Sequence, residues 1–247
     1  MVTNAIKQKM NRGEVALGAG CGIGAPVTAE MIALAGFDWV LIDNQHGTWD
    51  RGSSALAFMA VRAGGGVPVG RAPANDYAAI GRLLDEGALG IIVPLVETRE
   101  DAQRVAFACR YPPAGGRSVG PAGARAYGPD YMDRINDEVF VAIQLESKQA
   151  IGNAEAIMSV DGVDGCWLGP ADLALSLGHA PNTPQHDAAV HTMIAVCKKL
   201  GKAPGIAAGT VEQAAKWIAA GCTFVCVGAD SLWVMAGAKA ELSALRR

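Results

Sequence analysis

Two carboxylates, Glu146 and Asp172, each follow a short apolar run in the middle of the chain. The runs at residues 140–145 and 163–168 lack helical spacing, and a helix-length segment at residues 147–160 separates them. This pattern predicts a strand–helix–strand unit, in which parallel neighbouring strands end at the same rim of a sheet. Two oxygen ligands without a competing thiol suit Mg²⁺ or Mn²⁺. We therefore expect these acids to bind a divalent metal that holds a small oxo acid.

Each of the two acids also has an ordinary structural interpretation. Asp172 follows Gly-Pro-Ala and could cap a short helix, because Asp is a leading N-cap residue. Glu146 could be a solvated charge at the rim, which is the usual position of a lone Glu. Their shared position on adjacent predicted strand ends is what favours metal ligation.

Other polar residues follow apolar runs at the same predicted edge. His46 lies three residues after Asp43, so that one turn could bring the carboxylate to the imidazole, raise the basicity of the ring and fix its tautomer. Arg71 ends another run, where it could bind a substrate carboxylate or a developing enolate oxygen, or form a structural ion pair. Glu97 and Gln144 also lie at the ends of such runs. Polar residues thus gather at one predicted edge of the sheet, which is typical of an enzyme.

The elements that must position these side chains follow from the hydropathy pattern. Eight short apolar runs alternate with helix-length segments, without a linker or a break in composition. This alternation predicts a parallel sheet, and eight repeats allow it to close as a (β/α)₈ barrel with its active site at the C-terminal strand ends. An open doubly wound sheet is the competing architecture, but no G-x-G-x-x-G opens a helix after a strand. We predict an α/β fold, a single TIM barrel domain over residues 1–247.

The boundaries of these elements are read from the ends of the patterns. The predicted strands are residues 15–21, 38–43, 67–71, 90–95, 140–145, 163–168, 203–207 and 224–227. The predicted helices are residues 4–12, 27–34, 53–63, 76–86, 98–109, 147–160, 187–200, 211–220 and 231–245, with Thr98 as an N-cap. Residues 110–137 are the longest irregular stretch, and such long loops usually serve function or subunit contacts.

Composition excludes several classes of protein. The chain has 247 residues, 51% of them hydrophobic, and a net charge of −3, which gives no electrostatic case for nucleic acid or a membrane surface. Its six cysteines form no C-x-x-C pair and fit a reducing compartment, and no run approaches a transmembrane span, so we expect a cytoplasmic protein.

His179, His186 and His191 fall near a loop and a helix start, where we expect surface residues.

Six segments of the chain are similar to those of a known family: FDWVLIDNQHG, VGRAPAND, LLDEGALGIIVPLVET, RYPPAGGRSVG, VAIQLES and DGVDGCWLGPADLALSLG. They resemble the HpcH/HpaI-type hydroxy-oxo-acid aldolases, which are metal-dependent (class II) pyruvate aldolases of the phosphoenolpyruvate/pyruvate barrel superfamily. The similarity runs from about Asn4 to the C-terminal helix. The combination of RYPPAG-x-R with GPADL makes it specific.

The resemblance implies a (β/α)₈ barrel in which Glu146 and Asp172 hold Mg²⁺, Mn²⁺ or Co²⁺. Pyruvate would chelate the ion through its carboxylate and 2-oxo oxygens. Backbone amides of the stretch Gly169, Pro170, Ala171 and Asp172 would bind the pyruvate carboxylate at a short helix N-terminus, which favours an anion.

The resemblance also implies roles for the other polar residues. Arg71 would stabilise the enolate oxygen, and His46, oriented by Asp43, would act as the base through a water or on the substrate hydroxyl. Gln144 would line the site, and Asp85 would support it as a more distant acid. The family's packing implies a hexamer, a trimer of dimers, with the final helix exchanged between partner subunits.

The predicted reaction follows from the charge that it must stabilise. Retro-aldol cleavage leaves negative charge on a carbon, and a metal and a fixed Arg charge stabilise its delocalisation into a 2-oxo oxygen. No lysine falls at a predicted strand end, so no Schiff base is expected. The chain is thus predicted to be a class II aldolase that cleaves or forms a 4-hydroxy-2-oxo acid, giving pyruvate and an aldehyde via a metal-bound pyruvate enolate.

Two other functions fit the same residues less well. Another lyase could use the same metal enolate, such as an oxaloacetate decarboxylase or a citramalyl-CoA-type lyase. A CoA ester needs basic residues for its phosphates, and only the loop residues Arg117 and Arg125 are obvious candidates. A protein that only senses oxo acids would not need the full set of base, Arg and metal ligands.

Two positions depart from the family pattern. The family commonly has Glu immediately before the catalytic His, whereas this chain has Gln45, so one negative charge near the metal is missing. Many members carry a Trp at the end of the first strand, where this chain has Gly20, so the pocket is expected to be wider there or filled by another side chain. Both departures concern the aldehyde side more than the pyruvate half-site.

Overall fold

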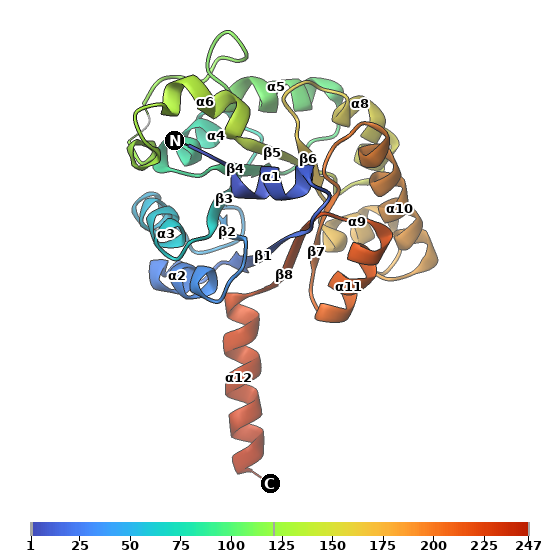
Figure 1. Cartoon of the computed structure of the whole chain (residues 1–247). Coiled ribbons are helices and arrows are strands. Elements are labelled where there is room, and N and C mark those ends of the chain that lie inside the picture. Colours follow the sequence, from blue (N-terminus) through green and yellow to red (C-terminus); the bar gives the residue numbers. More distant parts are fainter. Residues whose placement is uncertain (1, 121, 247) are drawn as a thin grey trace.

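Eight parallel strands form the centre of the molecule and helices surround them (Figure 1). The computed structural model describes residues 2–120 and 122–246. The strand order is β6-β5-β4-β3-β2-β1-β8-β7. The two ends of this order meet in parallel bridges, where the Leu168 amide donates to the Gly205 carbonyl at 2.9 Å and the Ala207 amide donates to the Leu168 carbonyl at 3.1 Å. The nearly closed sheet confirms the predicted TIM-barrel fold.

The strands coincide closely with the predicted apolar runs. They are β1 (Ala16–Cys21), β2 (Trp39–Asp43), β3 (Val67–Arg71), β4 (Gly90–Val93), β5 (Phe140–Gln144), β6 (Gly165–Trp167), β7 (Gly205–Ala208) and β8 (Phe224–Ala229). Because neighbouring strands are in parallel register, their C-terminal ends lie on one rim, and Asp43 pairs with Arg71 as Gln144 pairs with Trp167.

Several helices begin at a side-chain cap that the sequence supplies. The predicted N-cap Thr98 is confirmed, because its hydroxyl accepts from the Asp101 amide at 3.1 Å. The helices are α1 (Ala5–Asn11), α2 (Pro26–Leu34), α3 (Arg51–Ala63), α4 (Tyr77–Glu86), α5 (Arg99–Cys109), α6 (Tyr131–Glu138), α7 (Lys148–Gly152), α8 (Ala154–Met158), α9 (Pro170–Leu177), α10 (Pro184–Lys199), α11 (Val211–Ala220) and α12 (Asp230–Leu245), with a 3₁₀ turn at Ala124–Tyr127.

Three predictions need correction. The stretch at 110–137 is not wholly irregular, since it contains the 3₁₀ turn and most of α6. Only Tyr131 and Ile135 of α6 are buried, and two apolar residues are too few to show a helical pattern in the sequence. The predicted helix at 147–160 is divided into α7 and α8 at Asn153, whose side-chain amide donates to the Glu97 carbonyl instead of continuing one helix. His186 is buried, with Nε2 3.1 Å from the Pro170 carbonyl oxygen.

Aromatic side chains fill the barrel interior. Trp39 of β2 stacks on Phe224 of β8 with ring centroids 4.1 Å apart, and Phe140 of β5 packs against Phe224 at 4.8 Å. The indole of Trp39 extends over its strand neighbour Gly18, where a β-carbon would lie 2.1 Å from the ring. Gly18 is therefore required by the shape of the interior.

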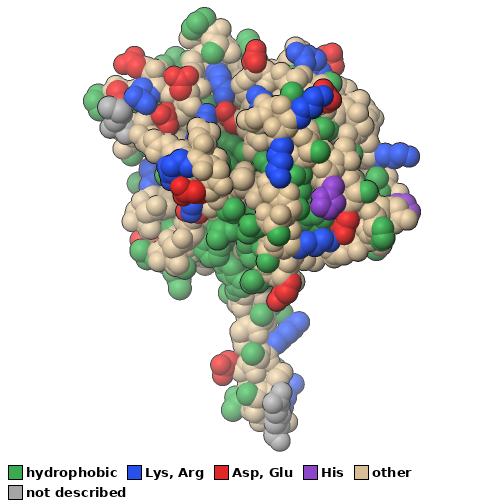
Figure 2. All heavy atoms as spheres, turned by 45° about the vertical axis from the view of Figure 1, so that its right-hand side comes forward, with side chains coloured by type: hydrophobic (Ala, Val, Ile, Leu, Met, Phe, Trp, Pro, Cys, Tyr) green, Lys and Arg blue, Asp and Glu red, His purple; other side chains and the backbone are tan. Residues whose placement is uncertain are grey.

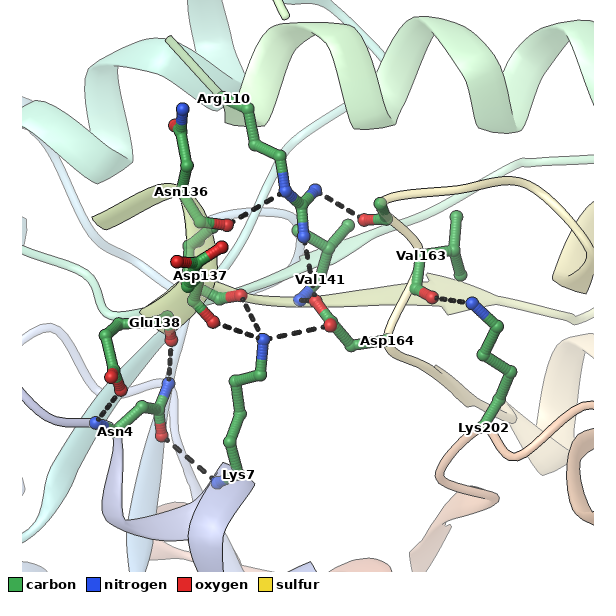
Figure 3. A network of polar contacts seen from close by, with 12 residues as sticks. Asn4, Lys7, Arg110, Asn136, Asp137, Glu138, Val141, Val163, Asp164 and Lys202 are labelled. Carbon is green, nitrogen blue, oxygen red and sulfur yellow. Dashed lines mark hydrogen bonds and ion pairs between the residues drawn. The ribbon is translucent and has the colours of Figure 1, made fainter. Parts of the chain in front are cut away.

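A polar network ties α1 to the N-terminal end of the barrel (Figure 3). Lys7 of α1 donates to Oδ1 of Asp164 at 3.0 Å, and Arg110 donates to Oδ2 of the same residue at 3.2 Å. The buried Asn4 donates to the carbonyls of Leu89 and Glu138. These contacts lie at the end opposite the polar rim, and they secure the fold.

Helix α12 lies where the sequence predicted the last helix, and it projects from the barrel (Figure 1). Asp230 at its start is buried and accepts from the amides of Gly22 and Ile23, but residues 231–246 are exposed. Trp233 and Met235 are among its exposed apolar side chains. Other hydrophobic side chains gather on the body above this helix (Figure 2).

Within residues 2–120 and 122–246, the structure contains no helix with the length and hydropathy that a bilayer crossing requires.

The fit of Gly18 against Trp39 gives a stability prediction. Gly18→Ala places a methyl group inside the Trp39 ring volume and should lower the free energy of unfolding by about 1–3 kcal/mol, as overpacking does. Gly81→Ala is the control, because a β-carbon there, within α4, meets nothing within 4 Å and should stabilise by up to about 1 kcal/mol through helix propensity. Urea unfolding of both variants measures this, and equal effects would contradict the packing account.

Candidate functional site

A cavity of about 160 Å³ opens at the C-terminal rim of the barrel. It brings together three of the predicted site residues, His46 after β2, Glu146 after β5 and Asp172 in the first turn of α9. Glu97, also predicted at this edge, lines it as well. The full lining is Gln45, His46, Leu95, Val96, Glu97, Glu146, Ser147, Ala150 and Asp172.

The two predicted metal ligands face one small space. A β-carbon placed on Gly169 would lie 3.3 Å from Oε2 of Glu146 and 3.6 Å from Oδ2 of Asp172. Gly169 thus leaves open a gap that both carboxylates border. Neither acid forms an ion pair within the described part of the chain, so two negative charges are left without a paired cation.

Glu146 is buried, and both of its carboxylate oxygens accept hydrogen bonds. Its Oε1 accepts from the Leu95 amide at 2.9 Å, and its Oε2 accepts from the side-chain amide of Gln144. Burial raises the pKa of Glu146 above its usual value; the Leu95 amide opposes this shift, and the nearby charge of Asp172 adds to it. A bound cation would offset both the desolvation of the Glu146 carboxylate and its repulsion by Asp172.

Leu95 is a site residue that the sequence does not reveal. Its φ of 58° is left-handed, which is unusual for a bulky residue and strains the backbone. This conformation accompanies the hydrogen bond from its amide to Glu146, while its side chain is 63% exposed on the cavity wall. In the sequence Leu95 is one more apolar residue at the end of a predicted strand, and nothing in its residue type indicates a role in the site.

Arg71 and Asp43 form a bidentate pair behind the cavity lining. Nε and Nη2 of Arg71 donate to Oδ1 and Oδ2 of Asp43 at 2.8 and 2.5 Å, and the guanidinium lies 5.2 Å from the centroid of Trp167. These two bonds leave Nη1 of Arg71 available to a ligand. The sequence left open whether Arg71 pairs with a protein carboxylate or binds substrate, and the fork geometry permits both.

Asp43 is bound differently from the predicted arrangement. Its Oδ1 accepts from the backbone amides of Gln45 and His46 at 3.1 and 3.2 Å, and the described contacts of its carboxylate do not include the His46 ring. Asp43 thus fixes the backbone that carries His46. Burial raises the pKa of Asp43, but the hydrogen bonds and charge of Arg71, with the two amides, outweigh burial and hold the pKa below its usual value.

Three buried polar atoms at the site have no partner within the described protein. They are Oε1 of Gln45, Oε1 of Gln144 and Nε1 of Trp167. Unpartnered buried groups of this kind are rare and are expected where a ligand or water binds. Together with the two unpaired carboxylates, they fit a site for a divalent cation and a small polar ligand, since oxygen donors are what Mg²⁺ and Mn²⁺ prefer.

The N-terminus of α9 supplies amides beside this site. Gly169 is its N-cap and Asp172 lies inside its first turn, so Asp172 does not act as the N-cap. Pro170 has no N–H, which leaves the amides of Gly169, Ala171 and Asp172 as the donors available to an anion.

The structure places two further sequence predictions elsewhere. Asp85 does not line the cavity; it lies near the C-terminal end of α4 and accepts from Arg117 at 2.7 Å. At Gly20 a β-carbon would lie 3.1 Å from the side chain of Ala229, so β8 fills this position and the cavity is not widened there.

Comparison with known proteins adds independent support. The family model of the HpcH/HpaI aldolase/citrate lyase matches residues 24–236. The 4-hydroxy-2-oxo-heptane-1,7-dioate aldolase of Klebsiella pneumoniae subsp. pneumoniae is 39% identical over 97% of this chain and 92% of its own length. A solved HpcH/HpaI aldolase/citrate lyase family protein from Burkholderia cenocepacia J2315 is 34% identical, with a TM-score of 0.93 over 99% of this chain and 100% of that one. The citrate synthase SbnG is 30% identical, with a TM-score of 0.88 over 97% and 96%.

The Asp43–Arg71 pair predicts a pH-dependent stability. Asp43→Asn should lower the free energy of unfolding at pH 7 by about 3 kcal/mol, because it leaves a buried guanidinium unpaired. The folded-state pKa of Asp43 is depressed, so this stabilisation is present above the unfolded pKa near ~3.9 and is lost as pH falls through the folded value.

Denaturant titrations of wild type and variant across this pH range measure the difference between them. Glu14→Gln, which removes an exposed pair with Arg12, is the control and should change stability little. A constant deficit of Asp43→Asn down to pH 3 would show that its effect is not electrostatic.

Proposed function

The chain belongs to the HpcH/HpaI aldolase/citrate lyase family, and from this premise we propose that it is a metal-dependent class II aldolase. Its enzymatic class is that of the carbon–carbon lyases. The proposed reaction cleaves or forms a 4-hydroxy-2-oxo acid, giving pyruvate and an aldehyde.

One observation carries the proposal. Glu146 and Asp172 border one small gap without a paired cation, in a cavity that they share with His46. The charge of Arg71 acts on Glu146, and its guanidinium is oriented by Asp43 through Nε and Nη2, which leaves Nη1 for a ligand. Within the described residues no lysine lines this cavity, which supports a metal over a Schiff base.

Glu146 and Asp172 would hold Mg²⁺, Mn²⁺ or Co²⁺, which when bound supplies a Lewis acid for the 2-oxo oxygen. Nη1 of Arg71 would donate to that oxygen as negative charge develops on it. The amides of Gly169 and Ala171 would bind the carboxylate of the oxo acid at the start of α9.

His46 would act as the base in the cleavage direction. It takes the proton of the C4 hydroxyl, the oxygen forms the aldehyde carbonyl, and the C3–C4 bond breaks with its electron pair passing to C3 of the pyruvate enolate. Protonation of C3 then gives pyruvate. Asp43 fixes the turn that presents His46, through the amides that it accepts from. Gln144 would orient Glu146 through the bond between their side chains.

A CoA-ester lyase is less well supported. Arg117, one of the two arginines that could bind CoA phosphates, is buried, and its guanidinium bonds Asp85 and the hydroxyl of Tyr131. The resemblance assigned Asp85 to the site, but in this chain its carboxylate pairs with Arg117. That Asp85 supports the active site remains a proposal. Oxaloacetate decarboxylation could proceed on the same residues.

A homo-oligomer would explain helix α12. A projecting helix that exposes Leu232 and Met235 to water is unfavourable, and so is the exposed apolar face of α2 with Met31 and Leu34. We propose that α12 packs on a partner subunit, as in a hexamer built as a trimer of dimers.

The metal ligands give the most direct activity prediction. Glu146→Gln and Asp172→Asn should each lower turnover by about 10²-fold or more, because each removes a charged oxygen ligand. The assay follows pyruvate released from a 4-hydroxy-2-oxo acid, with and without a chelator. Glu155→Gln, in an exposed pair with Lys199, is the matched control and should retain full activity. Full activity after complete metal removal would reject the proposal.

Arg71 gives a second prediction. Arg71→Met should lower kcat by about 10²–10³-fold, as loss of a donor to a developing oxyanion does, with a smaller effect on KM. Arg62, which stacks on Tyr127 and donates to the Gly87 carbonyl, provides the control as Arg62→Met. If KM rose while kcat stayed unchanged, Arg71 would bind ground-state substrate without stabilising the enolate.

A further inference from the structure

The charges around the cavity bear on the aldehyde half of the substrate. Its lining contains three carboxylates, those of Glu97, Glu146 and Asp172, and neither Lys nor Arg among the described residues. Glu146 and Asp172 are accounted for by a divalent cation. Glu97 is a third carboxylate in the lining, and it makes the cavity wall acidic.

Glu97 is held in place at the cavity wall. The Ser147 hydroxyl donates to its Oε1 at 2.8 Å, and its own backbone amide donates to Asp101 at 3.1 Å. No salt bridge neutralises it within the described part of the chain. A carboxylate fixed on the wall repels a second carboxylate on a substrate, and among the described residues no lysine or arginine lines this cavity to offset that repulsion.

The rest of the wall is apolar. Leu95, Val96 and Ala150 line it, and the side chain of Leu95 is largely exposed there. The backbone of Leu95 is left-handed, and its amide donates a hydrogen bond to Glu146, which ties this part of the wall to that acid. The cavity is also small, about 160 Å³ against the 300–1,000 Å³ typical of larger ligands.

We infer that the aldehyde this enzyme releases or accepts is short, uncharged and apolar. The inference rests on the proposed aldolase function and specifies its substrate class. It separates this chain from its Klebsiella relative, whose named substrate, a heptanedioate, carries a second carboxylate on the aldehyde half. Glu97 and Leu95 are the specificity residues, Glu97 by charge and Leu95 by shape.

Butanal and 4-oxobutanoate form a matched pair of probes, because the second carries a carboxylate in place of a methyl group. With pyruvate as the donor and Mg²⁺ or Mn²⁺ present, wild type should show the higher kcat/KM for butanal. Glu97→Gln should reduce this preference by about fivefold, since it removes one like charge at short range. Glu100→Gln, exposed on α5 outside this cavity, should leave the preference unchanged.

Leu95 is tested by chain length. Leu95→Asn keeps a residue that tolerates a left-handed backbone but removes the apolar wall. It should reduce the preference for butanal over acetaldehyde by about tenfold, the effect of losing a contact of one or two methylenes. An unchanged ratio would remove Leu95 from the aldehyde site.

A measurement without any aldehyde separates the inference from the proposed function. Metal-dependent exchange of the pyruvate methyl protons with deuterated water, followed by NMR, requires enolisation alone. Exchange together with a higher kcat/KM for 4-oxobutanoate would overturn the inference and leave the aldolase proposal standing, as would occur if a partner subunit supplied a cation. Absence of exchange would instead reject the aldolase proposal. Exchange with a butanal preference that Glu97→Gln weakens is the expected result.

Discussion

The repulsion between Glu146 and Asp172 is the constraint around which the rim is arranged. Parallel pairing of β5 with β6 brings the two acids to one rim, and Gly169 keeps the space between them open. Arg71 is the obvious cation to neutralise them, yet its fork is occupied by Asp43. The pair with Asp43 fixes the orientation of the guanidinium, whose charge acts on Glu146 without forming an ion pair with it. In the proposed function, a divalent cation would offset the charges of these two carboxylates.

The surrounding structure holds this unfavourable arrangement. Leu95 takes a strained backbone conformation to bind one oxygen of Glu146, and Gln144 binds the other. Backbone strain and shifted pKa values are common at functional sites, and the barrel beneath supplies the stability. Closely packed rings of Trp39, Phe224 and Phe140, with the ion pairs around Asp164 at the opposite end, form that rigid base.

The sequence predicted most of the fold because alternation of apolar runs with helices depends on short-range pattern, and all eight strands lie where the runs are. The acids of the rim were predicted for the same reason: in a parallel barrel, each residue at a strand end must reach one face. What the sequence missed depends on contacts between distant segments. The role of Leu95 arises from its bond to Glu146, the partner of Asp85 is Arg117, and His186 is buried by its contact with Pro170. The break at Asn153 likewise depends on a carbonyl 56 residues away in the chain.

The central claim, that these two carboxylates share one divalent ion, is tested most directly by a crystal structure grown with Mn²⁺ and pyruvate. The account predicts an anomalous difference peak between Oε2 of Glu146 and Oδ2 of Asp172, with both atoms bonded to the ion and with Nη1 of Arg71 directed at the 2-oxo oxygen of pyruvate. A peak bonded to only one of the two acids, or lying elsewhere in the barrel, would contradict it.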